Sequence, residues 1–317
     1  MESKQYLMKK FLEYYRKAKI EMPKSFEKRE FAFVPFEAFP EFYMQRHVFF
    51  SSKEDFRSYI ISKVPAHIYY SSAYYENPGK ERMEEKGWLG ADLIFDIDAD
   101  HLPLKTTSVE RTLEVAKREV KKLLQVLKLD FGIKEPEIYF SGGRGYHVHV
   151  CEEEFLKLDS AERREIVDYL TLNNPKILQK KKIIDSNIAL RVFAYLKQKK
   201  KIEGEELLKI LQNPEDVLEK FRIHIDAPVT ADVKRLIRMP GTLHGKTGLK
   251  VVKVEDIDSF NPLRDAIAFG EEKIKLRILK KTKIEIGGKK FNLNPGEVAE
   301  IPEFAGIYLL CRGFATL

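Results

Sequence analysis

The sequence predicts an α+β fold, with one larger domain built around a mixed sheet and a smaller helical subdomain inserted into it. Strand-like segments rich in aromatic residues occur before residue 154 and return after residue 222. Between these points, apolar residues recur at helical spacing. Because the strand pattern resumes after the helical stretch, we expect residues 1–154 and 222–317 to form one domain and residues 155–221 to form the insertion.

The first 90 residues are expected to form one helix followed by strands and loops. The apolar side of the helix would carry Leu7, Phe11 and Tyr14 or Tyr15. Short aromatic stretches punctuated by proline follow it, among them residues 31–34 and 47–50. This region is therefore predicted to contribute a sheet.

Residues 91–98 are predicted to form a strand that presents two carboxylates on one side. Because side chains alternate along a strand, Asp96 and Asp98 share a side with Ile94. A helix is predicted next, starting at a capping box of Thr107 and Glu110. Its apolar positions recur at gaps of three and four: Val109, Leu113, Ala116, Val120, Leu123, Leu124 and Leu127.

A hairpin follows, in which strands at residues 137–141 and 146–151 are joined by a glycine-rich turn at residues 142–145. In the helical insertion, one helix is expected to start at the capping box of Asp159 and Glu162, and another at Asn213 and Pro214. Strand-like patterns around residues 228–243 and 249–254 then complete the larger domain.

The overall composition bounds the function only loosely. The net charge of +7 and the pI near 9.0 favour an anionic partner, but many Lys and Glu residues also suit a heat-adapted surface. A lysine-rich run between Lys176 and Lys201 fits either a solvated helical face or a surface that follows phosphates. The sequence contains no stretch of roughly 20 uncharged apolar residues and no signal sequence, so a cytoplasmic protein without membrane contact is expected.

Cysteine usage argues against a disulfide framework and against a cysteine-rich zinc site. Only Cys151 and Cys311 are present, far apart and without a CxxC pair. Both are expected to be buried and reduced.

Asp96 and Asp98 are the first candidates for chemistry. An Asp-x-Asp pair alone often has a structural role. Here, however, the pair lies within an apolar run, where two adjacent carboxylates are unfavourable unless one is protonated or a cation lies between them. A hard, oxygen-seeking ion such as Mg²⁺ or Mn²⁺ suits these ligands. Asp100 is expected to be solvated or to cap a turn.

The stretch from Ser141 to His147 is the second candidate. Its three glycines let the backbone approach a ligand closely, and Arg144 offers a forked donor to phosphate. The alternative is a tight hairpin whose glycines only satisfy positive φ angles. His147 and His149 share a face and could imitate metal ligands, but a structural role is favoured for His149.

The third candidate is the stretch from Val229 to Gly248, in which Asp232 precedes a dense series of cationic residues. Arg238, His244 and Lys246 have the charge and donors that suit a triphosphate. Each of them alone is more often a surface charge. These residues support a functional site because all three candidate blocks occur in one chain.

These three blocks together resemble the small, catalytic subunit of the archaeal and eukaryotic type of DNA primase, most closely the archaeal form. The resemblance rests on residues 95–103, 139–147 and 230–244 with Lys246, and more weakly on residues 29–33. It implies a primase-type catalytic domain that makes short primers on single-stranded DNA from nucleoside triphosphates.

The resemblance also implies roles for individual residues. Asp96, Asp98 and Asp232 would be catalytic and would bind two Mg²⁺ or Mn²⁺ ions. The incoming triphosphate would lie between two groups of residues. One group comprises Ser141, Gly143, Arg144 and His147, and the other comprises Arg238, His244 and Lys246.

One feature departs from the family pattern. Members commonly carry a cysteine-rich zinc knuckle after the Asp-Ala-Asp-His stretch, whereas here Leu104 leads directly to Thr107 and a helix. We therefore predict no structural zinc. The expected partners are a large primase subunit with an iron–sulfur cluster and a single-stranded DNA template. The alternatives are a repair or translesion polymerase of the primase superfamily and a non-catalytic nucleic-acid-binding subunit.

Overall fold

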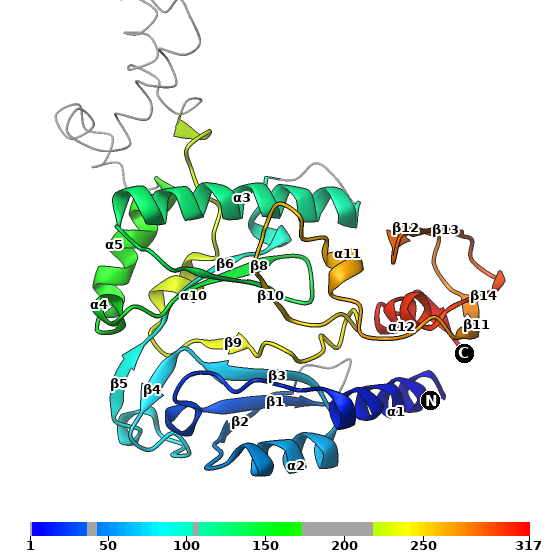
Figure 1. Cartoon of the computed structure of the whole chain (residues 1–317), viewed down its shortest axis with the longest axis horizontal. Helices are drawn as coiled ribbons and strands as arrows, with labels where there is room; N and C mark the ends of the chain where they lie inside the picture. Colours follow the sequence, from blue (N-terminus) through cyan, green and yellow to red (C-terminus); the bar gives the residue numbers. More distant parts are fainter. Residues whose placement is uncertain (1, 37–42, 104–107, 173–217) are drawn as a thin grey trace, which may run out of the picture.

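The computed structural model describes residues 2–36, 43–103, 108–172 and 218–317. Two four-stranded antiparallel sheets form the centre of this part of the chain, one above the other in Figure 1. Helices cover the outer face of each sheet (Figure 1). Helices thus flank two antiparallel sheets in an α+β architecture, and the predicted fold class is confirmed.

The first sheet comes from the N-terminal third of the chain and one later strand. Its order is β2 (Gln45–Val48), β1 (Phe31–Pro35), β3 (Pro65–Ser71) and β9 (Leu236–Arg238). Helix α2 (Lys53–Lys63) packs on its outer side, where Phe56 contacts Phe31. Helix α1 (Glu2–Lys17) buries Leu7, Phe11 and Tyr15, as its periodicity predicts.

The second sheet carries the strands that the sequence analysis placed around the carboxylates and the glycine turn. Its order is β10 (Val252–Val254), β7 (Glu137–Phe140), β8 (Tyr146–Val150) and β6 (Leu93–Ile97). Helix α3 (Val109–Asp130) covers its outer face (Figure 1). It buries an apolar stripe that includes Leu113, Val120 and Leu127. Ser108 occupies the N-cap of α3, one residue after the predicted Thr107, which lies outside the described residues.

Short helices connect the two sheets on one side of the molecule (Figure 1). Helix α4 (Glu153–Leu156) precedes α5 (Ser160–Thr171), whose capping box of Asp159 and Glu162 is present as predicted. Helix α5 packs against α10 (Ala227–Ala231), which in turn packs on β6. The strand expected from residue 228 is therefore wrong at its start, because Pro228 lies in the first turn of a helix, where proline needs no N–H partner.

The predicted insertion can be followed only in part. Of residues 155–221, the described ones are 155–172 and 218–221. The helix expected at Asn213 and Pro214 and the run from Lys176 to Lys201 lie outside the described residues. The division into two subdomains therefore stays a prediction.

A two-stranded ribbon extends from the first sheet. Strand β4 (Ala73–Tyr75) pairs with β5 (Trp88–Ala91). Single turns of 3-10 helix occur at η1 (Phe26–Lys28), η2 (Met83–Glu85) and η3 (Ala99–His101). The last of these directly follows β6 and orients the acidic residues at its end.

The C-terminal 56 residues, from Pro262 onward, form a smaller lobe beside the two sheets (Figure 1). It contains one short helix, a three-stranded sheet, a hairpin and a buried helix. The elements are α11 (Pro262–Asp265), β11 (Lys273–Ile278), β12 (Thr282–Ile286), β13 (Lys289–Leu293), β14 (Val298–Pro302), α12 (Glu303–Cys311) and β15 (Ala315–Thr316). Lys10 forms an ion pair with Glu303 (2.6 Å), which joins α1 to α12.

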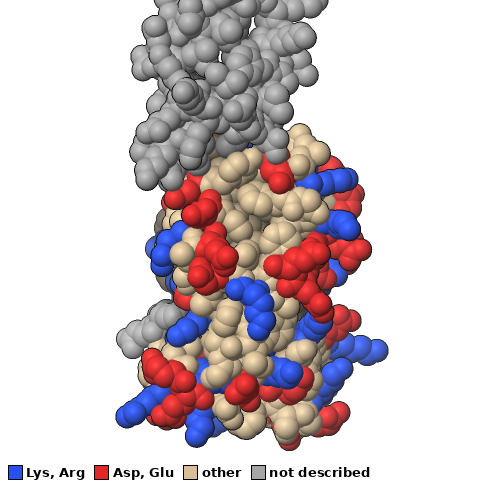
Figure 2. Space-filling view, turned by 90° about the vertical axis from the view of Figure 1, so that its left-hand side faces the viewer, with Lys and Arg blue, Asp and Glu red and all other residues tan. Residues whose placement is uncertain are grey.

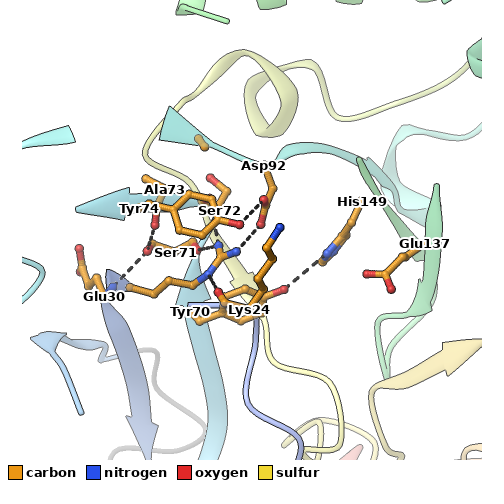
Figure 3. Close-up of polar contacts among 12 residues, drawn as sticks. Lys24, Glu30, Tyr70, Ser71, Ser72, Ala73, Tyr74, Asp92, Glu137 and His149 are labelled. Atoms are coloured by element: carbon orange, nitrogen blue, oxygen red, sulfur yellow. Dashed lines mark hydrogen bonds and ion pairs between the residues drawn. The ribbon is translucent and has the colours of Figure 1, made fainter. Parts of the chain in front are cut away.

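A buried polar network fixes the two sheets relative to one another (Figure 3). The Arg29 guanidinium is 1% exposed, and it donates to Asp92 (2.7 Å) and to the Ser71 carbonyl (2.7 Å). The Tyr70 hydroxyl of β3 lies 3.5 Å from Nδ1 of His149 on β8, so this contact crosses from one sheet to the other (Figure 3). Burial lowers the pKa of His149 to about 4, and its buried ring contact with Tyr70 is a structural role.

Charge on the described surface is mixed. Figure 2 shows the face at the left of Figure 1, where acidic and basic side chains lie interspersed around a band of uncharged ones. The described part of that face therefore does not concentrate the positive charge. In the ranges that the structure describes, no helix combines the length and the apolar character needed to cross a membrane.

Candidate active site

A cavity of about 390 Å³ opens between the two sheets. Both acidic and cationic side chains line it. Its lining residues are Met44, Arg46, Tyr69, Asp96, His147, Val229, Asp232, Lys234, Arg235, Leu236, Ile237 and Arg238. A volume of this size falls in the range typical of small-ligand sites.

Asp96 lies on β6, directly opposite His147 of β8 in the sheet register. Its burial, with the nearby carboxylates of Asp98 and Asp226, raises the pKa of Asp96 to about 7. The cations Arg238 and Arg235 oppose this shift only in part. A carboxylate in such surroundings binds a proton or a cation strongly, because its ionised form is otherwise poorly compensated.

His147 does not supply the missing positive charge. Its Nε2 lies 3.8 Å from Oδ1 of Asp96. However, burial, and then the neighbouring His149 and Arg238, hold the pKa of His147 well below its usual value. The ring is therefore neutral near pH 7 and can offer only hydrogen-bonding capacity next to Asp96.

Asp98 lies at the end of the same strand but in more open surroundings. Its side chain is 38% exposed, and it caps η3 by accepting from the Asp100 N–H (3.3 Å). Nη2 of Arg144 lies 3.9 Å from its Oδ1 and donates to Asp100 at 2.7 Å. Asp98 therefore lies next to the glycine turn, outside the set of residues that line the cavity.

Asp232 reaches the cavity from the turn that follows α10. Its carboxylate accepts from the backbone N–H of Lys234 (2.8 Å), which holds it at the start of the cationic series. Helix α10 brings this turn to β6, where the Asp226 N–H donates to the Asp96 carbonyl (2.8 Å). Two of the three predicted acids, Asp96 and Asp232, thus line one cavity.

The acidic side chains do not form a preformed metal-binding site. Across residues 2–36, 43–103, 108–172 and 218–317, no group of three or more His, Cys, Asp or Glu side chains is arranged to hold a metal ion. Magnesium sites in phosphate-transferring enzymes commonly use one or two carboxylates and complete the coordination with substrate phosphates and water. Asp96 and Asp232 suit that kind of site.

The glycine turn packs closely against the neighbouring parts of the site. A Cβ at Gly145 would lie 2.1 Å from the Ile97 carbonyl and 2.8 Å from the Asp98 Cα, so only glycine permits this approach. Gly142 has a φ of +77° and meets the His244 side chain. Of the turn glycines 142, 143 and 145, only Gly142 has positive φ, so a need for positive φ does not account for all three.

The turn and the third block are also joined by hydrogen bonds. The Thr247 hydroxyl donates to the Gly142 carbonyl (2.6 Å), and a Cβ at Gly143 would meet Nε2 of His244 at 3.2 Å. Ser141 is buried, and its hydroxyl accepts from the Gly143 N–H (3.4 Å). The fold therefore brings all three sequence blocks to one region.

The cationic side of the site combines buried and exposed groups. Arg238 of β9 lines the cavity, whereas Lys246 is exposed at the turn after His244. Burial, and then the charge of Arg238, hold the pKa of His244 well below its usual value, so this buried ring is neutral. Ser141, Gly143, Arg144, His244 and Lys246 lie outside the set of residues that line the cavity.

The sequence analysis did not identify several residues that lie near the predicted site. Arg46, Lys234 and Arg235 line the cavity, and Asp226 faces Asp96. Arg235 stands in the cationic series of the third block, which was a usable signal. No pattern pointed to Arg46, because its position depends on how β2 folds against β1.

Comparison with known proteins identifies the family. The family model described as DNA primase small subunit matches residues 95–257. The DNA primase small subunit PriS of Archaeoglobus fulgidus is 57% identical over 335 aligned positions, covering 100% of this chain and 99% of the relative. This chain belongs to the DNA primase small subunit family. The family predicted from the three sequence blocks is confirmed, and so is the predicted function of a DNA primase small subunit.

Other primase small subunits match over nearly their whole lengths. Those of Pyrobaculum aerophilum (40% identical, 97% of each chain) and Methanococcoides burtonii (37% identical, 99% of this chain and 98% of the relative) are examples. Among solved structures, the polymerase domain of Mycobacterium tuberculosis ligase D in complex with DNA aligns with a TM-score of 0.45. It is 10% identical, and the alignment covers 80% of this chain and 83% of that one.

Proposed function

We propose that this chain is the nucleotidyltransferase of a DNA primase, and that the cavity between the two sheets is its active site. It would join nucleotides from nucleoside triphosphates into short primers on single-stranded DNA. The observation that carries the proposal is that Asp96 and Asp232 line one cavity together with Arg235 and Arg238, in a chain of the primase small subunit family.

The residues present fit a divalent metal. Asp96 is a largely buried carboxylate whose pKa is raised by its surroundings, so Arg238 and Arg235 compensate its charge only in part. We propose that Asp96 and Asp232, with Asp98 from the end of β6, hold Mg²⁺ or Mn²⁺, two ions in the complete site. When bound, such ions lower the pKa of an attacking hydroxyl and stabilise a leaving pyrophosphate. The prediction that the chain needs no structural zinc also stays a proposal.

The chain's own cations would bind and orient the triphosphate. Arg238 and Arg235 would neutralise phosphate oxygens inside the cavity, where their charges already act on Asp96. Lys246 would add charge from the exposed turn. Arg144 would exchange its ion pair with Asp100 for a bidentate contact to phosphate.

The neutral groups around the turn would supply hydrogen bonds without adding charge. His147 and His244 are buried and neutral, so each can donate one ring N–H to a phosphate oxygen. The backbone of Gly143 lies against His244, and Ser141 lies next to Gly143, so both would close the same side of the triphosphate.

The proposed partners follow from the family. A large primase subunit with an iron–sulfur cluster would assist initiation, and single-stranded DNA would serve as template. Such a protein would work in the cytoplasm at the nucleoid, where that template is. Whether ribo- or deoxynucleotides are preferred would be read from the products.

The test is synthesis on an unprimed single-stranded template by the purified chain with Mg²⁺ or Mn²⁺ and labelled nucleotides, with and without the large subunit. We expect new labelled strands that disappear when EDTA is added. Extension of an added primer without new strands in either mixture would instead indicate a repair or translesion polymerase. Binding of DNA without any incorporation would indicate a non-catalytic subunit and would contradict the proposal.

A further inference from the structure

We propose that His67 of β3 is a positioning residue that holds Arg238 at the cavity wall and supports the turn carrying His244 and Lys246. This inference rests on the proposed function, because it assigns to Arg238 a task in binding the triphosphate. His67 itself is 2% exposed and lies behind the lining residues. It would therefore act through Arg238 and the turn, without touching the substrate.

The sheet register places His67 beneath Arg238. Strand β3 pairs with β9 so that Tyr69 lies directly opposite Arg238, and His67 is two residues earlier on the same face of β3. Nη1 of Arg238 lies 3.2 Å from Nδ1 of His67 and donates to the Tyr69 hydroxyl at 2.5 Å. Within the described residues both contacts use Nη1, so Nη2 and Nε remain for an anion in the cavity.

The hydrogen bonds around His67 determine its protonation. Its Nδ1 lies within reach of two groups that can only donate, the Arg238 guanidinium and the Gly245 N–H (3.4 Å). Nδ1 must therefore be an acceptor, and the ring proton is on Nε2. Burial, and then the charges of Arg238 and Lys246, hold the pKa of His67 well below its usual value, which agrees with a permanently neutral acceptor.

The same ring also supports the turn that follows β9. It meets His244 edge to face, with ring centroids 4.8 Å apart and planes at 86°. A Cβ at Gly245 would lie 3.0 Å from Nε2 of His67 and 3.0 Å from the Ala66 carbonyl, so this turn packs on β3 without any spare room. Loss of the imidazole would release Arg238 and the 244–246 turn together.

Two variants of His67 separate an acceptor at Nδ1 from an acceptor elsewhere on the ring. The amide oxygen of His67→Asn reaches the place of Nδ1, whereas that of His67→Gln reaches the place of Nε2. Loss of one charge-assisted hydrogen bond is worth about tenfold in affinity. In single-nucleotide extension of an annealed primer, we expect His67→Gln and His67→Leu to raise KM for the triphosphate by about tenfold. Their kcat should change much less, and His67→Asn should recover most of the loss.

Tyr69→Phe is the matched control, because it removes the other acceptor of Nη1 and leaves His67 in place. Binding of a labelled triphosphate, followed by fluorescence anisotropy, gives a readout that does not need catalysis. If the wild-type protein binds triphosphate but never incorporates it, the proposed function is contradicted. The binding comparison between the wild type and the His67 variants would still test this inference. Equal triphosphate affinity in wild type, His67→Gln and His67→Leu would overturn the inference.

A measurement on the wild-type protein covers the case in which the variants do not fold. Long-range ¹H–¹⁵N correlation spectra of the imidazoles report which ring nitrogen carries the proton. We expect His67 to be the neutral Nε2–H form at every pH from 6 to 8. An Nδ1–H form, or protonation of the ring within this interval, would overturn the inference.

Discussion

Replacing Asp96 by asparagine is expected to lower the rate of strand synthesis by at least about a thousandfold and, at the same time, to stabilise the metal-free protein above pH 7. The rate falls because the amide cannot hold a divalent ion against the cations of the cavity. The stability rises because the substitution removes a largely buried negative charge that lies near Asp98 and Asp226.

The pH dependence follows from the direction of the pKa shift. The fold raises the pKa of Asp96 from 3.8 to about 7, so the folded protein binds this proton more tightly than the unfolded chain. Ionisation of Asp96 therefore costs stability, from nothing below about pH 4 to a full cost, on the order of 4 kcal/mol, above about pH 7. Asparagine does not ionise, so the Asp96→Asn protein does not carry this cost.

Urea unfolding in EDTA at pH 5 and pH 8 measures the effect. Asp96→Asn should gain most at pH 8 and much less at pH 5, where wild-type Asp96 is largely protonated. Asp98→Asn is the control: its side chain is more exposed and keeps an acceptor for the Asp100 N–H, so it should lose synthesis with little change in stability. An Asp96→Asn protein that still makes strands would refute the assignment.

Replacing Glu30 by glutamine is expected to destabilise the fold by about 3–5 kcal/mol. The Glu30 carboxylate is fully buried and receives Nε of Arg46 (2.9 Å), with the buried Lys86 ammonium 3.2 Å from its other oxygen. Burial alone would raise the pKa of Glu30, but Arg46 and Lys86 lower it below its usual value. Glutamine would leave the Lys86 charge buried without its counter-ion.

The double variant Glu30→Gln with Lys86→Met separates this cause from a simple packing defect. It removes the unpaired ammonium, so it should recover much of the stability in urea unfolding at pH 7. It should not restore full nucleotide binding, since Arg46 at the cavity wall still lacks the carboxylate that fixes it. No gain on adding Lys86→Met would contradict this account.

Local patterns predicted the parts of the fold in which sequence period and burial agree. The alternation around Asp96 predicted β6, the three-and-four spacing predicted α3, and the glycines between two strand patterns predicted the hairpin of β7 and β8. Helix α3 buries one face, so its apolar spacing carries the information. Strands β6 and β8 are buried along nearly their whole length, and short apolar runs bounded by turn residues were enough to predict them.

Residues whose role depends on tertiary contacts could not be found in this way. Arg46 reaches the cavity because β2 shifts register against β1 and His47 adopts a φ of +63° next to it. Nothing in the local sequence distinguishes His67 from other histidines in strands, because its contact with Arg238 depends on the pairing of β3 with β9. The arrangement of Asp226 near Asp96 likewise appears only when α10 packs on β6.

The central claim is that the acids and cations of one cavity jointly hold a divalent ion and a triphosphate. Anomalous scattering from crystals grown with Mn²⁺ and a non-hydrolysable nucleoside triphosphate measures this directly. We predict a manganese peak coordinated by Asp96 and Asp232, with triphosphate oxygens completing its shell beside Arg238. Manganese bound at other carboxylates, or a triphosphate located outside the cavity, would contradict the account.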